Sequence, residues 1–325
     1  MRSNYTPREN PTRRRKRKLR KRVFLIPIFA IFLFVIWHFV SLYNTANDVI
    51  DKSFADDGRD KSDLREETVD PGEDNVSILI IGVDSSEKRE AYGTPRSDTL
   101  ILATLNKKEK SVKLVSIPRD SLVYIPEVGY ETKINHAHAY GGAKATIETV
   151  ENLLEIPVDY YVKLNFEAFI DVVDTINGVT VEVPFEMYEQ DSHDTKGAIH
   201  LLPGEQVLNG EEALAFARTR KYDNDIERGK RQQEILKAVI KKTISLNSFF
   251  KIDNVLEAVG ENMTTNMTFN EIKSLSSYGT AMKNIDIETF SLEGHDYQPG
   301  NTYYYQLDEF KLSETKEMLK NHLGL

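Results

Sequence analysis

A cluster of basic residues that runs directly into a long apolar segment constrains this chain more than any other feature. Residues 13–22 read RRRKRKLRKR, and residues 23–43 read VFLIPIFAIFLFVIWHFVSLY. An apolar segment of this length crosses a hydrocarbon core of ~30 Å, and flanking Lys and Arg stay on the cytoplasmic side. We therefore predict a cytoplasmic basic tail over 1–22, a transmembrane helix over 23–43, and a single-pass protein of the cell membrane whose body is extracellular.

Two other interpretations explain this N-terminus less well. A cleaved signal peptide has a shorter apolar region, and no clear small-x-small cleavage site follows the apolar segment here. A nucleic-acid-binding arm leaves unexplained why the basic cluster directly adjoins the apolar segment. An uncleaved membrane anchor accounts for both the length of the segment and the position of the charges.

The charges of the chain are divided unevenly between this N-terminus and the body. Residues 1–22 hold eleven Lys and Arg and one acid, whereas the remaining residues hold 31 basic and 50 acidic side chains, a net charge of −19. The phosphate backbone of a nucleic acid binds basic surfaces, and this body is acidic. We therefore expect no nucleic-acid partner. The chain has no cysteine, which excludes disulfides, thiol catalysis and Cys-ligated zinc.

Residues 44–74 and residues 75–325 differ in composition. The first segment is rich in charged residues and ends near Pro71-Gly72, so we expect an extracellular stalk that is partly helical near the membrane and otherwise flexible. In the second segment, the apolar run VSILIIGV at 76–83 is typical of a strand buried on both faces. We therefore expect residues 75–325 to form one folded extracellular domain.

Strand-like and helix-like patterns alternate through that domain. Further strands are expected at 99–105, 112–117, 158–164, 179–183 and 285–292, and helices at 143–155, 166–176, 209–218, 228–243, 270–282 and from 312 onward. This alternation predicts an α/β fold, an α/β/α sandwich around a mixed central β-sheet, preceded by the one N-terminal transmembrane helix.

Three polar segments adjoin the first three expected strands: Asp84, then residues 96–99 (RSDT), then residues 118–120 (PRD). If these strands run up, down and up, the segments meet at one edge of the sheet, where ligands of α/β proteins commonly bind. Asp84 and Asp98 there would suit a hard divalent cation such as Mg²⁺, which takes few ligands from protein. The alternative is that Asp84 caps a helix and Asp98 pairs with Arg96.

A basic cluster stands out within the acidic body. Residues 218–221 read RTRK, and Arg228, Arg231 and Gln232 follow at spacings that share a face of a helix. The planar fork of Arg suits phosphate oxygens. The alternative is a solvated helix face that pairs with nearby acids. His136 and His138 lack zinc-site spacing, and His136 is interpreted as a hydrogen-bonded structural residue. No G-x-S-x-G elbow, P-loop or kinase motif occurs.

Together these segments resemble the LytR–CpsA–Psr family of Gram-positive cell-envelope proteins, and most closely its LytR-type cell-wall polymer transferases. The resemblance is dense over residues 75–245 and looser to the C-terminus. It is carried by ILIIGVD (78–84), RSDTLILATLN (96–106), VSIPRD (115–120), KINHAHAYGG (133–142), VDYYVKLNFEAF (158–169), DVVDTINGVTVEVP (171–184) and LNGEEALAFARTR…ERGKRQQ (208–233).

The resemblance implies a magnesium-dependent phosphotransferase that acts at the cytoplasmic membrane. Such proteins move anionic glycopolymers, such as wall teichoic acid, from an undecaprenyl diphosphate carrier to peptidoglycan. They form a phosphodiester at the C6 hydroxyl of N-acetylmuramic acid, and a hydrophobic channel holds the polyprenyl chain. A polyprenyl-diphosphate hydrolase with the same residues, and a non-enzymatic envelope regulator or lipid sensor, are the alternatives.

The resemblance also implies roles for individual residues. Asp84 and Asp98 correspond to magnesium-binding acids, and Asp98, Arg119 and Asp120 are the expected catalytic residues. Whether Asp120 or no group at all acts as general base stays open at this point. The residues expected to bind the diphosphate are Arg96, Arg119, Arg218, Arg220, Arg228, Arg231 and Gln232.

Overall fold

A computed structural model describes residues 47–84, 95–221, 225–245, 258–281 and 285–325 of the chain. The predicted basic tail and the predicted transmembrane helix at 23–43 lie outside these described residues. None of the helices within the described ranges combines the length and the apolar character needed to cross a membrane. Residues 46–325 form a unit of their own, and the description below concerns that unit.

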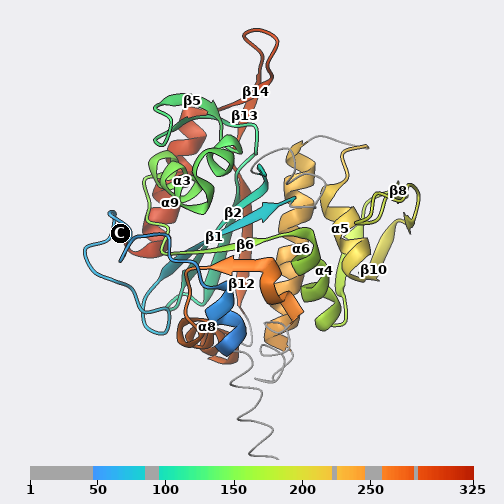
Figure 1. Ribbon diagram of the computed structural model, residues 1–325, viewed down its shortest axis with the longest axis horizontal. Helices are drawn as coiled ribbons and strands as arrows, with labels where there is room; N and C mark the ends of the chain where they lie inside the picture. Colours follow the sequence, from blue (N-terminus) through green and yellow to red (C-terminus); the bar gives the residue numbers. More distant parts are fainter. Residues whose placement is uncertain (1–46, 85–94, 222–224, 246–257, 282–284) are drawn as a thin grey trace, which may run out of the picture. The chain divides into compact units, whose positions relative to one another are not determined.

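A six-stranded mixed sheet lies at the centre of this unit (Figure 1), as the alternating pattern predicts. Its strand order is β11-β6-β1-β2-β3-β12. β1 pairs antiparallel with β2, and β2 with β3, whereas β6 lies parallel to β1 and β12 lies parallel to β3. The bounds are β1 (Val76–Val83), β2 (Ser97–Asn106), β3 (Ser111–Ser116), β6 (Tyr160–Leu164), β11 (Met263–Thr265) and β12 (Asp286–Ser291).

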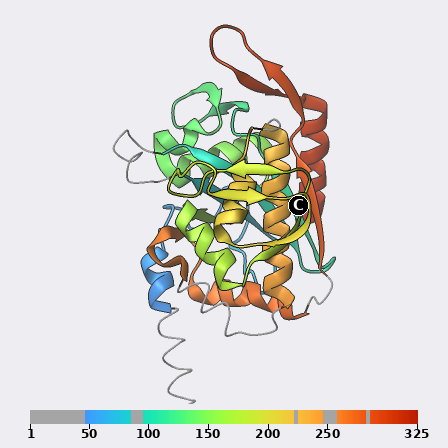
Figure 2. The same ribbon diagram turned by 90° about the vertical axis from the view of Figure 1, so that its right-hand side faces the viewer.

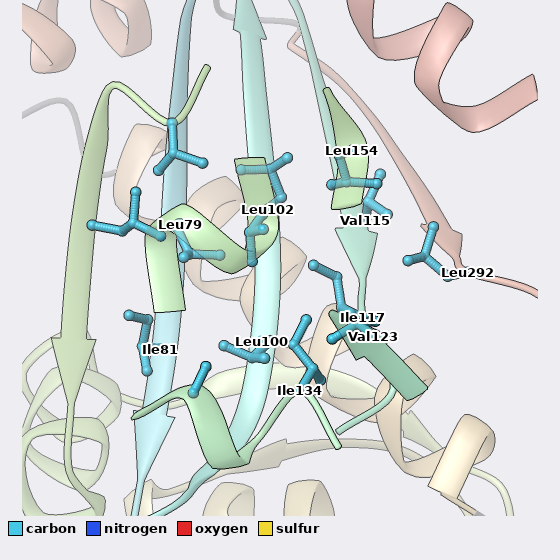
Figure 3. Packing of buried hydrophobic residues seen from close by; sticks show 14 of the residues in the cluster. Leu79, Ile81, Leu100, Leu102, Val115, Ile117, Val123, Ile134, Leu154 and Leu292 are labelled. Carbon is cyan, nitrogen blue, oxygen red and sulfur yellow. The ribbon is translucent and has the colours of Figure 1, made fainter. Parts of the chain in front are cut away.

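Both faces of the sheet are covered by helices. Alternate residues of each strand point to opposite sides, so both faces present apolar side chains that a helix can bury. Leu79, Leu100 and Leu102 belong to the larger core cluster (Figure 3), which continues into α3 (His136–Leu154) and α9 (Glu309–Leu323). Ile101 and Ala103, on the other face, contact α6 (Asp225–Ser245). The structure is therefore an α/β/α sandwich.

Smaller elements surround this sandwich. α4 (Phe166–Thr175) and α5 (Gly210–Arg218) lie beside α6, and Asn209 caps α5 through the capping box with Glu212 that its sequence predicts. The strand expected at 179–183 forms, but as β7 (Val179–Val183) it pairs with β10 (Gly204–Leu208) outside the central sheet. The other elements are β4 (Leu122–Ile125), β5 (Tyr130–Lys133), β8 (Met187–Glu189), β9 (Ile199–Leu201), η1 (Gly260–Asn262), α8 (Phe269–Ala281), β13 (Gly294–Tyr297) and β14 (Tyr304–Leu307).

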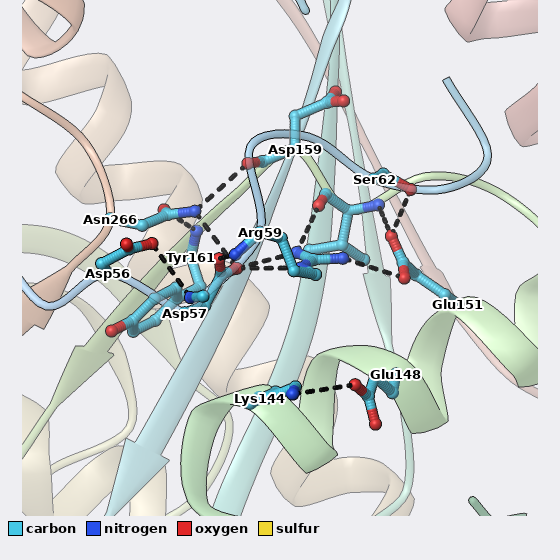
Figure 4. A network of polar contacts seen from close by, with 12 residues as sticks. Asp56, Asp57, Arg59, Ser62, Lys144, Glu148, Glu151, Asp159, Tyr161 and Asn266 are labelled. Atoms are coloured by element: carbon cyan, nitrogen blue, oxygen red, sulfur yellow. Dashed lines mark hydrogen bonds and ion pairs between the residues drawn. The ribbon is translucent and has the colours of Figure 1, made fainter. Parts of the chain in front are cut away.

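The expectation of a flexible stalk over residues 44–74 needs correction. Its described part, residues 47–74, packs on the domain. Residues 47–53 are helical, and Ile50 within them is fully buried. Arg59 pairs with Glu151 of α3 at 3.0 Å (Figure 4). Arg65 pairs with Asp159 at 2.7 Å. High charge density suggested solvation, but the charges bind partners on the domain that the sequence does not reveal.

Candidate functional site

The ends of β1, β2 and β3 bring three predicted site residues to one edge of the sheet. The antiparallel pairing of these strands confirms the up, down and up order: Gly82 lies opposite Thr99, and the amide of Ile117 donates to the carbonyl of Leu100 at 2.9 Å. Asp84 directly follows β1, Asp98 is the second residue of β2, and Arg119 follows β3. All three side chains line the same cavity.

The N-terminal turn of α6 closes this edge from one side. Gly229 allows it, because a Cβ at this position would lie only 2.9 Å from Oγ of Ser116 on β3. Arg228 therefore reaches over the strand ends, where its side chain is 4 % exposed. Its Nη2 donates to the backbone carbonyl of Asp98 at 3.0 Å and forms an ion pair with the carboxylate of Asp225 at 3.0 Å.

The cavity has a volume of about 460 Å³ and lies between the sheet and helices α4, α5 and α6. Along α6 its lining changes from Arg228 and Gln232 to Ile235, Leu236 and Val239. Arg228 and Val239 are eleven positions apart, or ~16 Å along the helix, so polar and apolar walls occupy opposite ends. The other apolar lining residues are Ile80, Ile101, Leu164, Phe166, Phe169, Val172, Leu214 and Ala217, and the other polar ones include Asp84, Asp98, Arg119, Glu189, Gln190, Arg218 and Arg220.

At the polar end of the cavity, the carboxylates of Asp98 and Asp225 pair with three guanidinium groups, those of Arg119, Arg220 and Arg228. Arg119 donates from Nη1 to Asp98, and its Nε lies 3.9 Å from Asp225. Arg220 lies 3.9 Å from Asp98 and 3.8 Å from Asp225. Such crowded cations attract an anion that supplies further negative charge.

Two buried donors in this cluster have no hydrogen-bond partner among the described residues: Nε of Arg119 and Nε of Arg228. A buried donor without an acceptor costs roughly 1–3 kcal/mol. Unsatisfied groups of this kind call for an explanation, and two of them beside one cavity are suited to the oxygens of a bound anion. The arrangement therefore fits a phosphate-bearing ligand.

Burial perturbs the ionisable groups of the cluster. It raises the pKa of Asp225, against the opposing effect of the charges on Arg119 and Arg220. Burial, followed by the like charge of Arg119, lowers the pKa of Arg220. From the sequence, Asp225 is only one of the nearby acids that could pair with a solvated helix face, yet the structure places it beside Arg119, Arg220 and Arg228. Asp225 meets these arginines only through the tertiary fold, which no local sequence pattern shows.

Arg218 and Gln232 line the cavity and are held in place by backbone carbonyls. Nη2 of Arg218 donates to the carbonyls of Gln190 at 3.1 Å and Asp191 at 2.7 Å. Nε2 of Gln232 donates to the carbonyl of Ala217 at 3.3 Å. Both side chains are thus positioned at the polar half of the cavity before any ligand arrives.

The structure places Arg231 apart from the other residues that were predicted to bind the diphosphate. It is 5 % exposed and does not line the cavity. Its Nε donates to the carbonyl of Phe216 at 3.0 Å, and its Nη2 to the carbonyl of Thr219 at 2.7 Å. At ~100° per residue, Arg228 and Gln232 share one face of α6, whereas Arg231 faces the C-terminal end of α5. It stabilises the packing of these helices.

Arg96 and Asp120 also lie outside the lining of the cavity. Arg96 is exposed just before β2, and Asp120 pairs with Lys133 at 2.9 Å and lies 3.7 Å from Nε of Arg119. The apolar wall that α4 provides was missed from the sequence. Its signal is the spacing of Phe166, Phe169 and Val172, which share one face of that helix.

Asp84 and Asp98 are the carboxylates suited to a magnesium ion in this cavity. Within the described ranges, no group of three or more His, Asp or Glu side chains is arranged to hold a metal. Magnesium does not need such a group, because one or two carboxylates suffice when waters and substrate phosphates complete its shell. The two aspartates therefore fit a magnesium ion that binds together with a phosphate ligand.

Comparison with known proteins gives consistent results. The chain matches the model of the LytR_cpsA_psr family over residues 37–321. It is 46% identical over 258 residues to the polyisoprenyl-teichoic acid–peptidoglycan teichoic acid transferase TagT of Bacillus subtilis (strain 168), covering 79% of each chain.

Solved structures of related proteins share the fold. A structure described as TagT bound to LIIa-WTA has a TM-score of 0.71 and 42% identity, with 82% of this chain and 97% of that chain covered. A second, described as the LytR-CPS2A-psr family protein YwtF (TagT) with bound octaprenyl pyrophosphate lipid, has a TM-score of 0.67 and 40% identity, with 82% and 98% covered.

Proposed function

Because the chain belongs to the LytR–CpsA–Psr family, we propose that it transfers an anionic glycopolymer, such as wall teichoic acid, from undecaprenyl diphosphate to peptidoglycan. The observation that carries this proposal is the cavity with a polar end rich in arginine and an apolar end between the sheet and α4, α5 and α6. A polyprenyl diphosphate has the same two-part chemistry. Its diphosphate suits the arginines, and its hydrocarbon chain suits the apolar walls.

In this transfer the acceptor oxygen, the C6 hydroxyl of N-acetylmuramic acid, forms a bond to the phosphorus that carries the glycopolymer. The bond from that phosphorus to the bridging oxygen breaks, and polyprenyl monophosphate leaves with the electron pair. Negative charge therefore grows on the leaving phosphate. Arg119, Arg220 and Arg228 are placed to stabilise it, since fixed cations in a site shielded from water act strongly on developing charge.

Asp84 and Asp98 are proposed to hold magnesium in this reaction. The ion would supply positive charge to the phosphate oxygens. Arg119 orients the carboxylate of Asp98 by its hydrogen bond, and Arg228 binds the backbone carbonyl of the same residue. The start of β2 is thereby fixed relative to the arginines that would bind the diphosphate.

The proton of the acceptor hydroxyl must leave as the new bond forms. Both carboxylates considered for this role are engaged with cations: Asp98 with Arg119, and Asp120 with Lys133 at 2.9 Å. This pairing favours alignment of the acceptor, with release of its proton to solvent, over catalysis by a dedicated base.

The experiment uses the full chain in detergent with magnesium, a lipid-diphosphate-linked saccharide and peptidoglycan oligomers, and detects products by mass spectrometry. We expect a phosphodiester-linked conjugate that is lost in Asp98→Ala and Arg119→Ala. Lys230→Ala is the matched control, because Lys230 is an exposed cation on α6 that pairs with Glu227. Release of lipid monophosphate and saccharide phosphate without conjugate would support the hydrolase instead. Lipid binding without turnover would support the lipid sensor.

The catalytic domain is proposed to be extracellular and anchored by residues 23–43, with residues 1–22 in the cytoplasm. The chain has no cysteine, so single cysteines report topology directly. In intact cells, a membrane-impermeant maleimide should label Glu317→Cys, which replaces an exposed residue of α9, and should leave Ser3→Cys unlabelled. Labelling of Ser3→Cys alone would reverse the proposed orientation.

A further inference from the structure

Four tyrosines gather on the surface beside the ends of β2 and β3, and we call them the tyrosine surface: Tyr130, Tyr140, Tyr303 and Tyr304. Three of them are well exposed, at 51 % for Tyr130, 43 % for Tyr140 and 37 % for Tyr303. The rings of Tyr130 and Tyr140 meet edge to face at 6.5 Å. Single exposed aromatic residues are ordinary, but these four come from separate elements: β5, α3, and β14 with the residue before it.

Lys133 joins the two halves of this surface. It belongs to β5 with Tyr130, and its Nζ lies 5.6 Å from the ring centre of Tyr303 and 5.9 Å from that of Tyr304. On the other side, His136 packs against Tyr140 at 5.9 Å. Burial, and then the positive charges of Arg96 and Lys133, lower the pKa of His136. Arg96, which is exposed just before β2, therefore lies near His136.

The tyrosine surface is tied to the strand end that carries Arg119. The amide of Tyr305 donates to the carbonyl of Asp120 at 2.9 Å, which fixes the β13–β14 hairpin beside β3. Lys133 also pairs with Asp120 at 2.9 Å, and Asp120 lies 3.7 Å from Nε of Arg119. Figure 1 shows β5 and the hairpin at the same end of the sheet, and Figure 2 shows the hairpin extending beyond it. One step of contacts therefore separates Lys133 from the proposed diphosphate site.

The chemistry of this surface suits a saccharide. The C–H face of a pyranose ring packs on an aromatic ring, and the hydroxyl and acetamido groups around the sugar need polar partners. Phenolic oxygens, Lys133 and Arg96 supply such partners. Asp296 orients one ring by accepting a hydrogen bond from the hydroxyl of Tyr303 at 2.8 Å.

We propose that the tyrosine surface binds the glycan strand of the acceptor, a polysaccharide of N-acetylated hexosamines, and presents one of its hydroxyls to the phosphorus beside Arg119. This assignment rests on the proposed transferase function. The lipid donor is proposed to fill the cavity, and the attacking and leaving oxygens lie roughly in line in a phosphoryl transfer. The acceptor must then approach from outside the cavity, where Lys133 and Asp120 connect the tyrosine surface to Arg119.

The test measures binding directly and does not depend on turnover. The full chain in detergent is titrated calorimetrically with a soluble tetrasaccharide of alternating N-acetylglucosamine and N-acetylmuramic acid. Tyr140→Ala and Tyr303→Ala should each weaken this binding about tenfold, whereas Tyr140→Phe should retain most of it, because it keeps the ring. Tyr188→Ala is the matched control, since Tyr188 on β8 is 49 % exposed and lies outside the tyrosine surface.

Each outcome separates this inference from the proposed function. Wild-type binding in both alanine variants, or no binding by the wild type, overturns the inference even if the conjugate still forms. Weakened tetrasaccharide binding supports it even if no conjugate forms, in which case the transferase proposal alone fails. In active protein, the two variants should raise KM for the acceptor and leave the affinity for the lipid donor unchanged. Loss of binding to anionic lipid vesicles, with saccharide binding intact, would show that the tyrosines contact a membrane instead.

Discussion

Arg119, just after β3, donates a hydrogen bond from Nη1 to Oδ1 of Asp98 at the start of β2. The two residues are 21 positions apart in sequence and meet because their strands pair antiparallel. This contact joins a proposed phosphate-binding cation to a proposed magnesium ligand. A substitution of either side chain removes the hydrogen bond that orients the other. Mutations of this pair therefore test the proposed site directly.

Substitution of Arg119 is expected to reduce transfer strongly. Arg119→Lys keeps the charge but loses the planar fork, and we expect kcat to fall about 10²-fold, within the range for loss of one oriented charge-stabilising donor. Arg119→Ala should lower it further. Steady-state rates of conjugate formation give the answer, with Lys230→Ala as the control. Full activity in Arg119→Lys would mean that only a diffuse positive charge is needed.

Arg220 and Arg231 should separate activity from stability. Arg220 lines the cavity and is partly exposed, so Arg220→Ala should lower the rate of transfer and leave Tm nearly unchanged. Arg231 is buried and binds two carbonyls at the end of α5. Arg231→Met should therefore destabilise the protein by roughly 1.5–3 kcal/mol. Thermal unfolding and transfer assays on both variants decide this, and a loss of activity with unchanged Tm in Arg231→Met would return that residue to the diphosphate site.

The apolar end of the cavity should determine how the enzyme responds to lipid length. Val239 lies there, about three turns of α6 from Arg228, so Val239→Trp should obstruct a long polyprenyl chain. We expect KM to rise for a donor with a full-length chain and to change little for a donor with a short chain. Val207→Trp, on exposed β10, is the control. An equal effect on both donors would show that the chain lies elsewhere.

His322 should make stability depend on pH. Burial, followed by the charge of Lys113, lowers its pKa, and its ring nitrogens lie 2.8 Å from the hydroxyls of Thr104 and Ser111. A group with a lowered folded-state pKa contributes stability that is present above its unfolded pKa of about 6.5 and is lost as the pH falls through its folded pKa.

Denaturant unfolding of wild type and His322→Gln between pH 7 and pH 5 tests this. The difference in free energy of unfolding between the two proteins should shrink as the pH falls, with exposed His200→Gln as the control. A difference that stays constant over this range would mean that His322 acts only through packing.

Local patterns predicted five of the six strands of the central sheet, all but β11, and three of its strand-end residues. The apolar runs at 76–83, 99–105 and 112–117 each became a strand, and their order alone placed Asp84, Asp98 and Arg119 at one edge. Residues 47–74 could not be placed in this way, because their charges pair with acids such as Glu151 and Asp159 far along the chain.

Tertiary contacts decided the remaining differences. Arg228 and Arg231 both lie on the same predicted helix, yet only the packing of α5 against α6 shows that Arg231 faces α5. Burial of Asp225 likewise depends on the strand ends beneath α6. The two strands of the β13–β14 hairpin are short, read GHDY and YYQL, and gave no clear strand pattern. The proximity of the hairpin to Lys133 follows from the fold alone.

A single-turnover reaction in H₂¹⁸O tests the central claim most directly. The full chain is mixed with magnesium, the lipid-linked donor and peptidoglycan oligomers, and mass spectrometry locates the heavy oxygen. If the sugar hydroxyl is the attacking group, the phosphodiester conjugate forms and neither it nor the released polyprenyl monophosphate carries ¹⁸O. If no conjugate forms and ¹⁸O appears in the saccharide phosphate or in the polyprenyl monophosphate, water is the acceptor. That result would contradict the proposed transferase.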